Sequence, residues 1–169
     1  MELKEVLLKR RSVRKFTEEI VPQGFIEELL IAAMSGPSAC NRRPWEFYVV
    51  TNEQVIQELR GASRFTNMSA KLAIVVAGNL ANALPAQMAE YWLQDCSAAV
   101  ENILLRVTDL GLGAVWCGLH PQEKAANKVA ELLNAEESIV PLGLLWIGYP
   151  AEEPEARTQY EESKVHYIQ

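Results

Sequence analysis

Cysteine and histidine are scarce in this sequence, and their scarcity excludes several kinds of site. The 169 residues include three cysteines, Cys40, Cys96 and Cys117, without CxxC spacing, so neither a disulfide framework nor a four-thiolate zinc site is indicated. The two histidines, His120 and His166, belong to no recognisable nucleophile motif. We therefore expect no metal site and no catalytic side chain, and we infer that any chemistry comes from a bound cofactor.

Long apolar runs and an excess of positive charge are also missing. No apolar stretch approaches the roughly 20 residues of a spanning helix, and the charged start, MELKEVLLKRRS, does not fit a signal peptide. A formal net charge of -6 argues against binding to nucleic acid. Because unpaired cysteines suit a reducing compartment, we expect a cytoplasmic protein that binds neither membranes nor nucleic acid.

The length and composition predict a folded chain. Hydrophobic residues make up 49% and charged residues 22%, which is ordinary globular usage. No repeat, low-complexity segment or linker divides the chain, so we expect one domain over residues 1–169.

The apolar pattern predicts both helices and strands. Helical spacing occurs around residues 3–7, from Pro22 to Ser35, after Asn52 as N-cap, and over 87–110 and 121–133. Strand-like runs lie at 46–51, 72–77, 113–119 and 140–149, and the last three are continuous apolar runs that we expect to be buried. Since strands and helices do not alternate regularly, an α+β fold is favoured over a doubly wound sheet. Residues 151–169 have no core stripe, so they form either a loose tail or an arm that packs on another subunit.

A basic cluster near the start is the first candidate site. Arg10, Arg11 and Arg14 could bind phosphate oxygens through their guanidinium groups, and the Ser12 hydroxyl adds a donor. The alternative is a solvated basic face near a helix C-terminus, where cations complement the helix dipole.

The loop SGPSACNRRPW is the second candidate. Small residues, two prolines, Ser38 and Asn41 would make it stiff, with exposed backbone donors and acceptors that could recognise a flat heteroaromatic edge. The alternative is a simple connection between two elements.

The third candidate, GLGAVWCGLH, does not fit a dinucleotide fingerprint. That turn needs glycine or alanine where this chain has Trp116. Cys117 and His120 are too few to bind zinc, so a core cysteine beside a loop histidine is the better interpretation.

Five segments in order, RRSVRKF, SGPSACNRRPWEF, LGLGAVWCG, IGYP and ARTQYEESKVHY, resemble the nitroreductase family of FMN enzymes over nearly the whole chain. The resemblance implies an antiparallel-rich mixed sheet flanked by helices. It also implies a homodimer with FMN at the subunit interface, and a C-terminal extension that packs on the partner.

The resemblance further implies roles for single residues. Arg10 and Ser12 match contacts to the phosphate and ribityl chain, with Arg11 nearby, and Arg157 matches a basic residue that reaches the phosphate. Arg14 matches the cation at the N1 and C2 oxygen edge of the flavin, where it would stabilise negative charge. The remaining matches are Ser38, Ala39 and Asn41, which would line the flavin of the other subunit, and Cys117 and Gly118, whose turn would face flavin N5.

The implied activity is hydride transfer from NADH or NADPH through FMN to a nitroaromatic, quinone or similar acceptor in a ping-pong cycle. Alternatives within the fold are dehalogenation, ring oxidation, flavin breakdown and non-catalytic flavin binding. Arg43 replaces a glutamine common in relatives, and Gln159 replaces a second tail arginine. The first departure bears on the substrate or nicotinamide side of the pocket, and the second bears on the strength of the tail contact to the phosphate. The acceptor and the choice between NADH and NADPH stay open.

Overall fold

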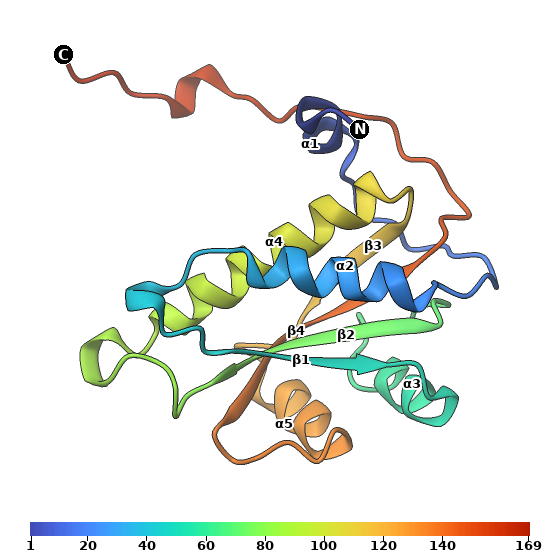
Figure 1. Cartoon of the computed structure of the whole chain (residues 1–169), viewed down its shortest axis with the longest axis vertical. Helices are drawn as coiled ribbons and strands as arrows, with labels where there is room; N and C mark the ends of the chain where they lie inside the picture. Colours follow the sequence, from blue (N-terminus) through green and yellow to red (C-terminus); the bar gives the residue numbers. More distant parts are fainter.

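The computed structural model describes residues 1–169 and contains five α-helices and four β-strands (Figure 1). The helices are α1 (Leu3–Lys9), α2 (Gln23–Met34), α3 (Glu53–Arg60), α4 (Tyr91–Asp109) and α5 (Glu123–Leu132). The strands are β1 (Trp45–Val50), β2 (Leu72–Asn79), β3 (Gly113–Gly118) and β4 (Ile139–Gly148). Short 3-10 turns occur at Ala39–Asn41, Ala86–Met88 and Glu162–Lys164. No helix combines the length and the apolar character that crossing a membrane requires.

The strands form one sheet in the order β1-β2-β4-β3, and every neighbouring pair is antiparallel. Parallel pairing is limited to a bridge between Ser12 and Ala114, which sets the segment after α1 against the outer edge of β3. The central strand β2 is buried on both faces, since the consecutive residues Ile74 and Val75 are both fully buried. Its continuous apolar sequence therefore reflects helices on both sides of the sheet.

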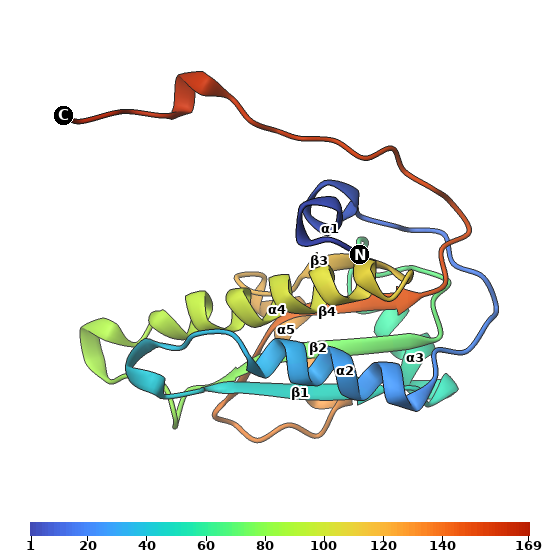
Figure 2. The ribbon, with the colours of Figure 1, turned by 45° about the horizontal axis from the view of Figure 1, so that its top comes forward.

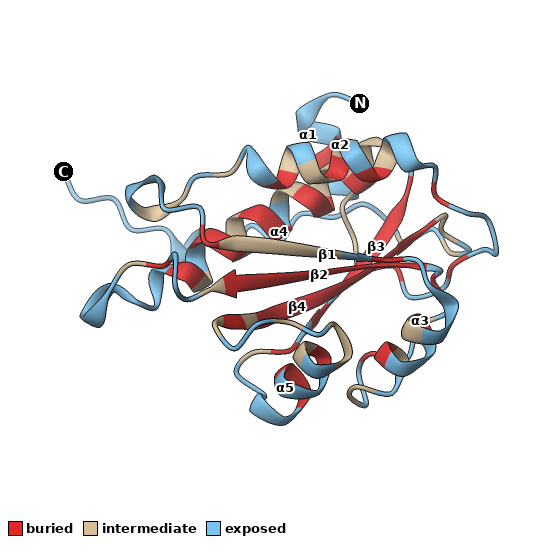
Figure 3. Ribbon diagram, turned by 60° about the horizontal axis from the view of Figure 1, so that its bottom comes forward, coloured by how far each residue is buried: buried red, intermediate tan, exposed pale blue.

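Two helices cover each face of the sheet (Figures 1 and 3). On one face α2 and α4 contribute Leu29 and Ile103 to an apolar core, and on the other face α3 and α5 contribute Leu59 and Val129 to a second core. The remaining helix, α1, lies beside the C-terminal part of α4. The basic cluster thus begins where α1 ends and lies next to the edge of the sheet.

The expected α+β fold is confirmed, and the elements lie close to their predicted positions. Asn52 caps α3, as expected, because its side chain accepts hydrogen bonds from the N–H groups of Gln54 and Val55 at 3.0 and 3.1 Å.

Two expectations about the elements are corrected. The long helix begins at Tyr91 rather than near residue 87, because residues 86–88 form a separate turn in which Ala86 has a φ of 53°. The strand at 113–118 is only partly buried. Trp116, on the edge strand β3, is 38% exposed, and its ring lies over Gly143 of β4.

Residues 151–169 leave the sheet, pass beside α1 and extend away from the body of the chain (Figure 2). None of them is buried. One hydrogen bond, from the Arg157 N–H to the Leu8 carbonyl at 3.1 Å, ties this tail to α1. The tail therefore brings Arg157 to the basic cluster although 143 or more residues separate them in the sequence.

Candidate functional site

The segment after α1 is held against β3 by one apolar side chain. The N–H of Val13 donates to the Ala114 carbonyl at 2.9 Å, and the Val13 side chain is buried against Gly113. A Cβ at Gly113 would lie 2.8 Å from Val13, so only glycine permits this approach. In an extended segment neighbouring side chains point to opposite sides, which leaves Ser12 and Arg14 on the side away from Val13.

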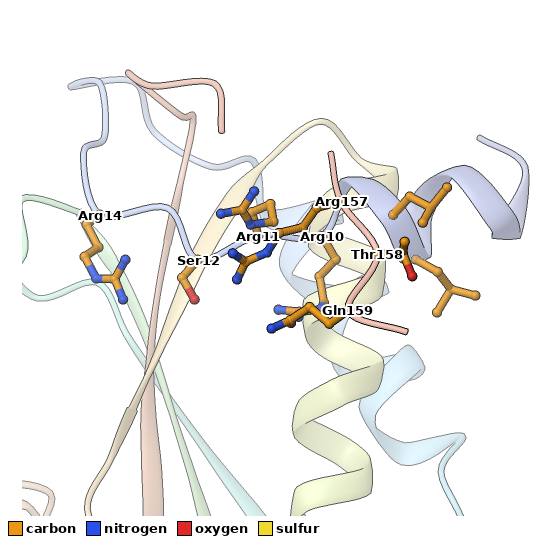
Figure 4. Close-up of a pocket in the computed structure, with 9 residues that line it drawn as sticks. Arg10, Arg11, Ser12, Arg14, Arg157, Thr158 and Gln159 are labelled. Atoms are coloured by element: carbon orange, nitrogen blue, oxygen red, sulfur yellow. The ribbon is translucent and has the colours of Figure 1, made fainter. Parts of the chain in front are cut away.

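A hollow of about 380 Å³ opens over this segment (Figure 4). Its walls contain four arginines and no carboxylate: the lining residues are Leu7, Leu8, Arg10, Arg11, Ser12, Arg14, Arg157, Thr158 and Gln159. Figure 4 shows Ser12 between Arg14 on one side and the other arginines on the opposite side. The side chains thus offer mainly hydrogen-bond donors and positive charge, as a phosphate group requires.

The protein neutralises only part of this charge. The Arg10 Nε lies 3.3 Å from a carboxylate oxygen of Glu101 on α4, in a pair open to solvent. The guanidinium of Arg11 donates to the backbone carbonyl of Glu155. Arg157 has no carboxylate partner, so the hollow keeps a net positive charge in an acidic protein.

Arg14 lies at the other end of this segment, near Cys117. The Arg14 N–H donates to the Glu152 carboxylate at 2.7 Å, and this bond lowers the pKa of Glu152. The Cys117 Sγ lies 3.1 Å from the Phe65 carbonyl; burial raises the pKa of this thiol to about 11, although the charge of Arg14 opposes the shift. The thiol is therefore neutral, and its inertness agrees with a structural rather than a nucleophilic role.

Beyond Ala114 the outer edge of β3 has no strand partner. Ala114 faces this edge, so the alternation along the strand also turns the backbone of Gly118 toward it and that of Cys117 toward β4. The structure thus brings Arg10, Arg11, Ser12, Arg14, Cys117, Gly118 and Arg157 to one edge of one chain.

The remaining candidates lie elsewhere. Ser38, Ala39 and Asn41 belong to the turn before β1, at the N-terminal end of α4 and away from the arginine hollow (Figures 1 and 2). The Ala39 N–H donates to the buried Asp95 carboxylate at 2.8 Å, and the Arg43 N–H donates to the Ser38 Oγ at 3.0 Å. One chain alone therefore does not bring the two sets together.

Sequence reasoning missed the residue that holds this turn, Asp95, which is 6% exposed on α4. It also missed Asn102, two helical turns later, which donates to the Ala32 carbonyl at 3.0 Å and so holds the C-terminal end of α2. The signal was a carboxylate within the apolar stripe that includes Trp92, Cys96 and Ala99, since a charged side chain is rarely buried without a partner.

Comparisons with known proteins extend over the whole chain. A family model described as "Nitroreductase family" matches residues 7–71 and 65–149. A protein of Methanothermobacter thermautotrophicus, provisionally named NADH dehydrogenase/NAD(P)H nitroreductase, is 36% identical over 98% of this chain and 86% of its own length. A protein of Archaeoglobus fulgidus with the same name is 36% identical over 96% of this chain and 95% of its length. The structure of an FMN-dependent nitroreductase from Clostridium difficile superposes with a TM-score of 0.89 at 28% identity, covering 98% of this chain and 99% of that one.

Proposed function

The chain belongs to the nitroreductase family, and we propose that it is an FMN-dependent oxidoreductase that uses NADH or NADPH to reduce a nitroaromatic, a quinone or a similar acceptor. The observation that supports this proposal best is the hollow in which Ser12 and four arginines, without a carboxylate, surround a space suited to a single phosphate group. The name of the Clostridium difficile protein, an FMN-dependent nitroreductase, supports the same cofactor.

The residues present fit FMN. Arg10, Arg11, Ser12 and Arg157 would hold the phosphate and the adjoining ribityl chain, because they provide charged and neutral donors in one place. Arg14 would lie at the N1 and C2 oxygen edge of the ring, where a fixed positive charge raises the reduction potential by stabilising negative charge. Bound FMN would supply the redox chemistry, accepting hydride at N5, while the backbone at Cys117 and Gly118 would orient that edge of the ring.

We also propose that two copies of the chain share each flavin. Ser38, Ala39 and Asn41 would then line the flavin bound by the arginine hollow of the partner, which accounts for their distance from that hollow within one chain. Exposed apolar residues on α1, α2 and the tail support an interface: Leu3, Leu7, Ile31, Met34, Tyr167 and Ile168 are each more than half exposed.

The absorbance spectrum tests the cofactor and the activity together. We expect the purified protein to be yellow and to lose its flavin absorbance on anaerobic addition of NADH or NADPH. In steady-state kinetics, double-reciprocal plots of rate against coenzyme concentration, at several concentrations of the acceptor, should be parallel. The variant Arg10→Ala/Ser12→Ala should lose FMN. A colourless protein that stays colourless after FMN is added, or a variant that keeps its full complement of flavin, would contradict the proposal.

A further inference from the structure

A second basic hollow lies on the other side of the Cys117–Gly118 turn. It has a volume of about 610 Å³ and is formed by the loop after α3 and the first turns of α5. Three cations, Arg64, Lys124 and Lys128, line it, together with one carboxylate, Glu123. The lining therefore carries a net positive charge in a chain whose formal charge is -6, and it suits an anionic ligand.

The loop that carries Arg64 is well organised. The buried Thr66 hydroxyl bonds to the Arg60 carbonyl at 3.1 Å, and the Ser63 N–H donates to the Thr66 Oγ at 2.9 Å. The Arg64 guanidinium lies over the Phe65 ring, 4.5 Å from its centre, so its position is partly fixed before a ligand arrives.

Two contacts connect this hollow to the proposed flavin site. The carbonyl of Phe65, next to Arg64, receives the Cys117 thiol contact at 3.1 Å. The Gln122 side chain, which lines the hollow, donates to the Gly118 carbonyl at 3.4 Å. The basic hollow is therefore adjacent to the turn that would face flavin N5.

FMN does not account for this second cluster. FMN carries one phosphate, and the hollow of Arg10, Arg11, Ser12 and Arg157 already suits it. A nicotinamide coenzyme carries a diphosphate bridge, and NADPH carries a further phosphate on its adenosine ribose. A ligand whose nicotinamide ring lies on the flavin could thus place a phosphate in the second hollow.

We propose that Arg64 and Lys124, with support from Lys128, bind a phosphate group of the nicotinamide coenzyme and so determine which donor the enzyme prefers. This inference rests on the proposed function, because it assumes that the flavin lies at Cys117 and Gly118. Lys128 has a supporting role because its Nζ donates to the Gly61 carbonyl at 2.7 Å and thereby holds the loop against α5.

Steady-state kinetics of the FMN-loaded protein with NADH and with NADPH test the inference. We expect Arg64→Ala/Lys124→Ala to raise the coenzyme KM about tenfold while kcat and flavin content stay unchanged, because the proposal assigns these side chains to a coenzyme phosphate and not to the reacting atoms or the flavin. Lys71→Ala is the matched control: Lys71 is an exposed cation paired with Glu18 at 2.7 Å outside this hollow, and its loss should leave KM unchanged. Glu123→Gln should lower KM, since it removes the only carboxylate of the lining.

The pattern across the two donors identifies the phosphate. A rise in KM for NADPH alone supports contact with the ribose phosphate, and an equal rise for both donors supports contact with the diphosphate bridge. Unchanged KM values for both donors in the double variant, with normal turnover by the wild type, would overturn this inference and leave the proposed function intact. A wild-type protein that binds no FMN would overturn both.

Discussion

The two parts of the proposed flavin site are held in different ways. Residues 10–14 are extended and pair with the edge of β3, where Val13 fits against Gly113. Residues 38–43 form a tight turn in which Cys40, Asn41 and Arg43 have φ values of 50°, 53° and 49°, and the buried Asp95 holds this turn from α4. The first part is held by its pairing with the sheet. The second part is held by its surroundings, because non-glycine residues adopt its backbone conformation only where the surrounding structure fixes it.

This difference shows what each part can do alone. The first part joins Arg157 of the tail and the Cys117–Gly118 turn within the same chain, so it can hold one end of a ligand by itself. The second part lies away from that hollow (Figures 1 and 2), so one chain alone does not bring its residues to a ligand bound there. The two parts can act on one flavin only if two chains share the site, and mutation can test this requirement directly.

Mixing two inactive variants should give the largest effect. Arg10→Ala/Ser12→Ala damages the first part, and Ala39→Trp, at a partly exposed position of the turn without a positive φ, would block the second part of the partner's site. If sites are shared, a mixed dimer has one site with both lesions and one intact site, so co-refolded variants should regain about a quarter of wild-type activity. Activity no greater than the sum of the separate variants would show that each chain forms its own site.

Gly113→Ala tests the first part alone. The new Cβ would lie 2.8 Å from Val13, so we expect a loss of about 1–3 kcal/mol in the free energy of unfolding and weaker FMN binding as residues 10–14 move outward. Gly24→Ala, within α2 and with no atom within 4 Å of the new Cβ, is the control. It should stabilise the protein by about 0.5–1 kcal/mol, because alanine favours helix more than glycine does. Denaturant unfolding with flavin titration measures both effects, and equal results for the two variants would count against the proposed packing.

The sequence predicted the elements well because each carries a local signal. Apolar runs such as LAIVVA and the cap at Asn52 depend on neighbouring residues, and the structure confirms both. The start of α4 was placed too early because no Pro or Gly separates residues 87–90 from the helix, while the positive φ of Ala86 and the turn that follows have no apolar signature. The exposure of Trp116 depends on the order of strands, which periodicity does not report.

The candidate site was accessible from sequence mainly through its charges. The arginine cluster is local, and the structure does place it in one hollow with Arg157. Three further features are contacts between distant segments: the arginine cluster meets the tail, Arg10 pairs with Glu101, and Asp95 accepts a hydrogen bond from Ala39. Such contacts follow from packing and not from residue spacing, so no pattern in a single sequence predicts them.

Asp95 variants test the second part of the comparison. Asp95→Ala leaves the Ala39 N–H without its partner, and we expect a loss of about 1–3 kcal/mol in the free energy of unfolding together with faster hydrogen exchange at Ala39. Asp95→Asn keeps an acceptor oxygen of similar shape and should recover much of both effects. Under the shared-site proposal Asp95→Ala also weakens flavin binding by the partner. Unchanged exchange at Ala39 would show that the hydrogen bond does not hold the turn.

Glu152→Gln should have the smallest effect and a distinctive dependence on pH. The N–H groups of Arg14 and Lys15 donate to this carboxylate at 2.7 and 3.3 Å, and the bond from Arg14 is the main cause that lowers its pKa in the folded protein. A lowered pKa means that the charged form stabilises the fold at pH values above the ordinary range of glutamate, and that this contribution is lost as pH falls through the lowered pKa. Melting temperatures of wild type and variant should therefore differ at neutral pH and converge as the pH falls below the ordinary pKa range of glutamate. Glu153→Gln is the control, because the Glu153 carboxylate accepts no backbone hydrogen bond, and it should show no such convergence. If the difference in melting temperature between wild type and Glu152→Gln stayed constant with pH, the charge of Glu152 would not hold residues 14 and 15.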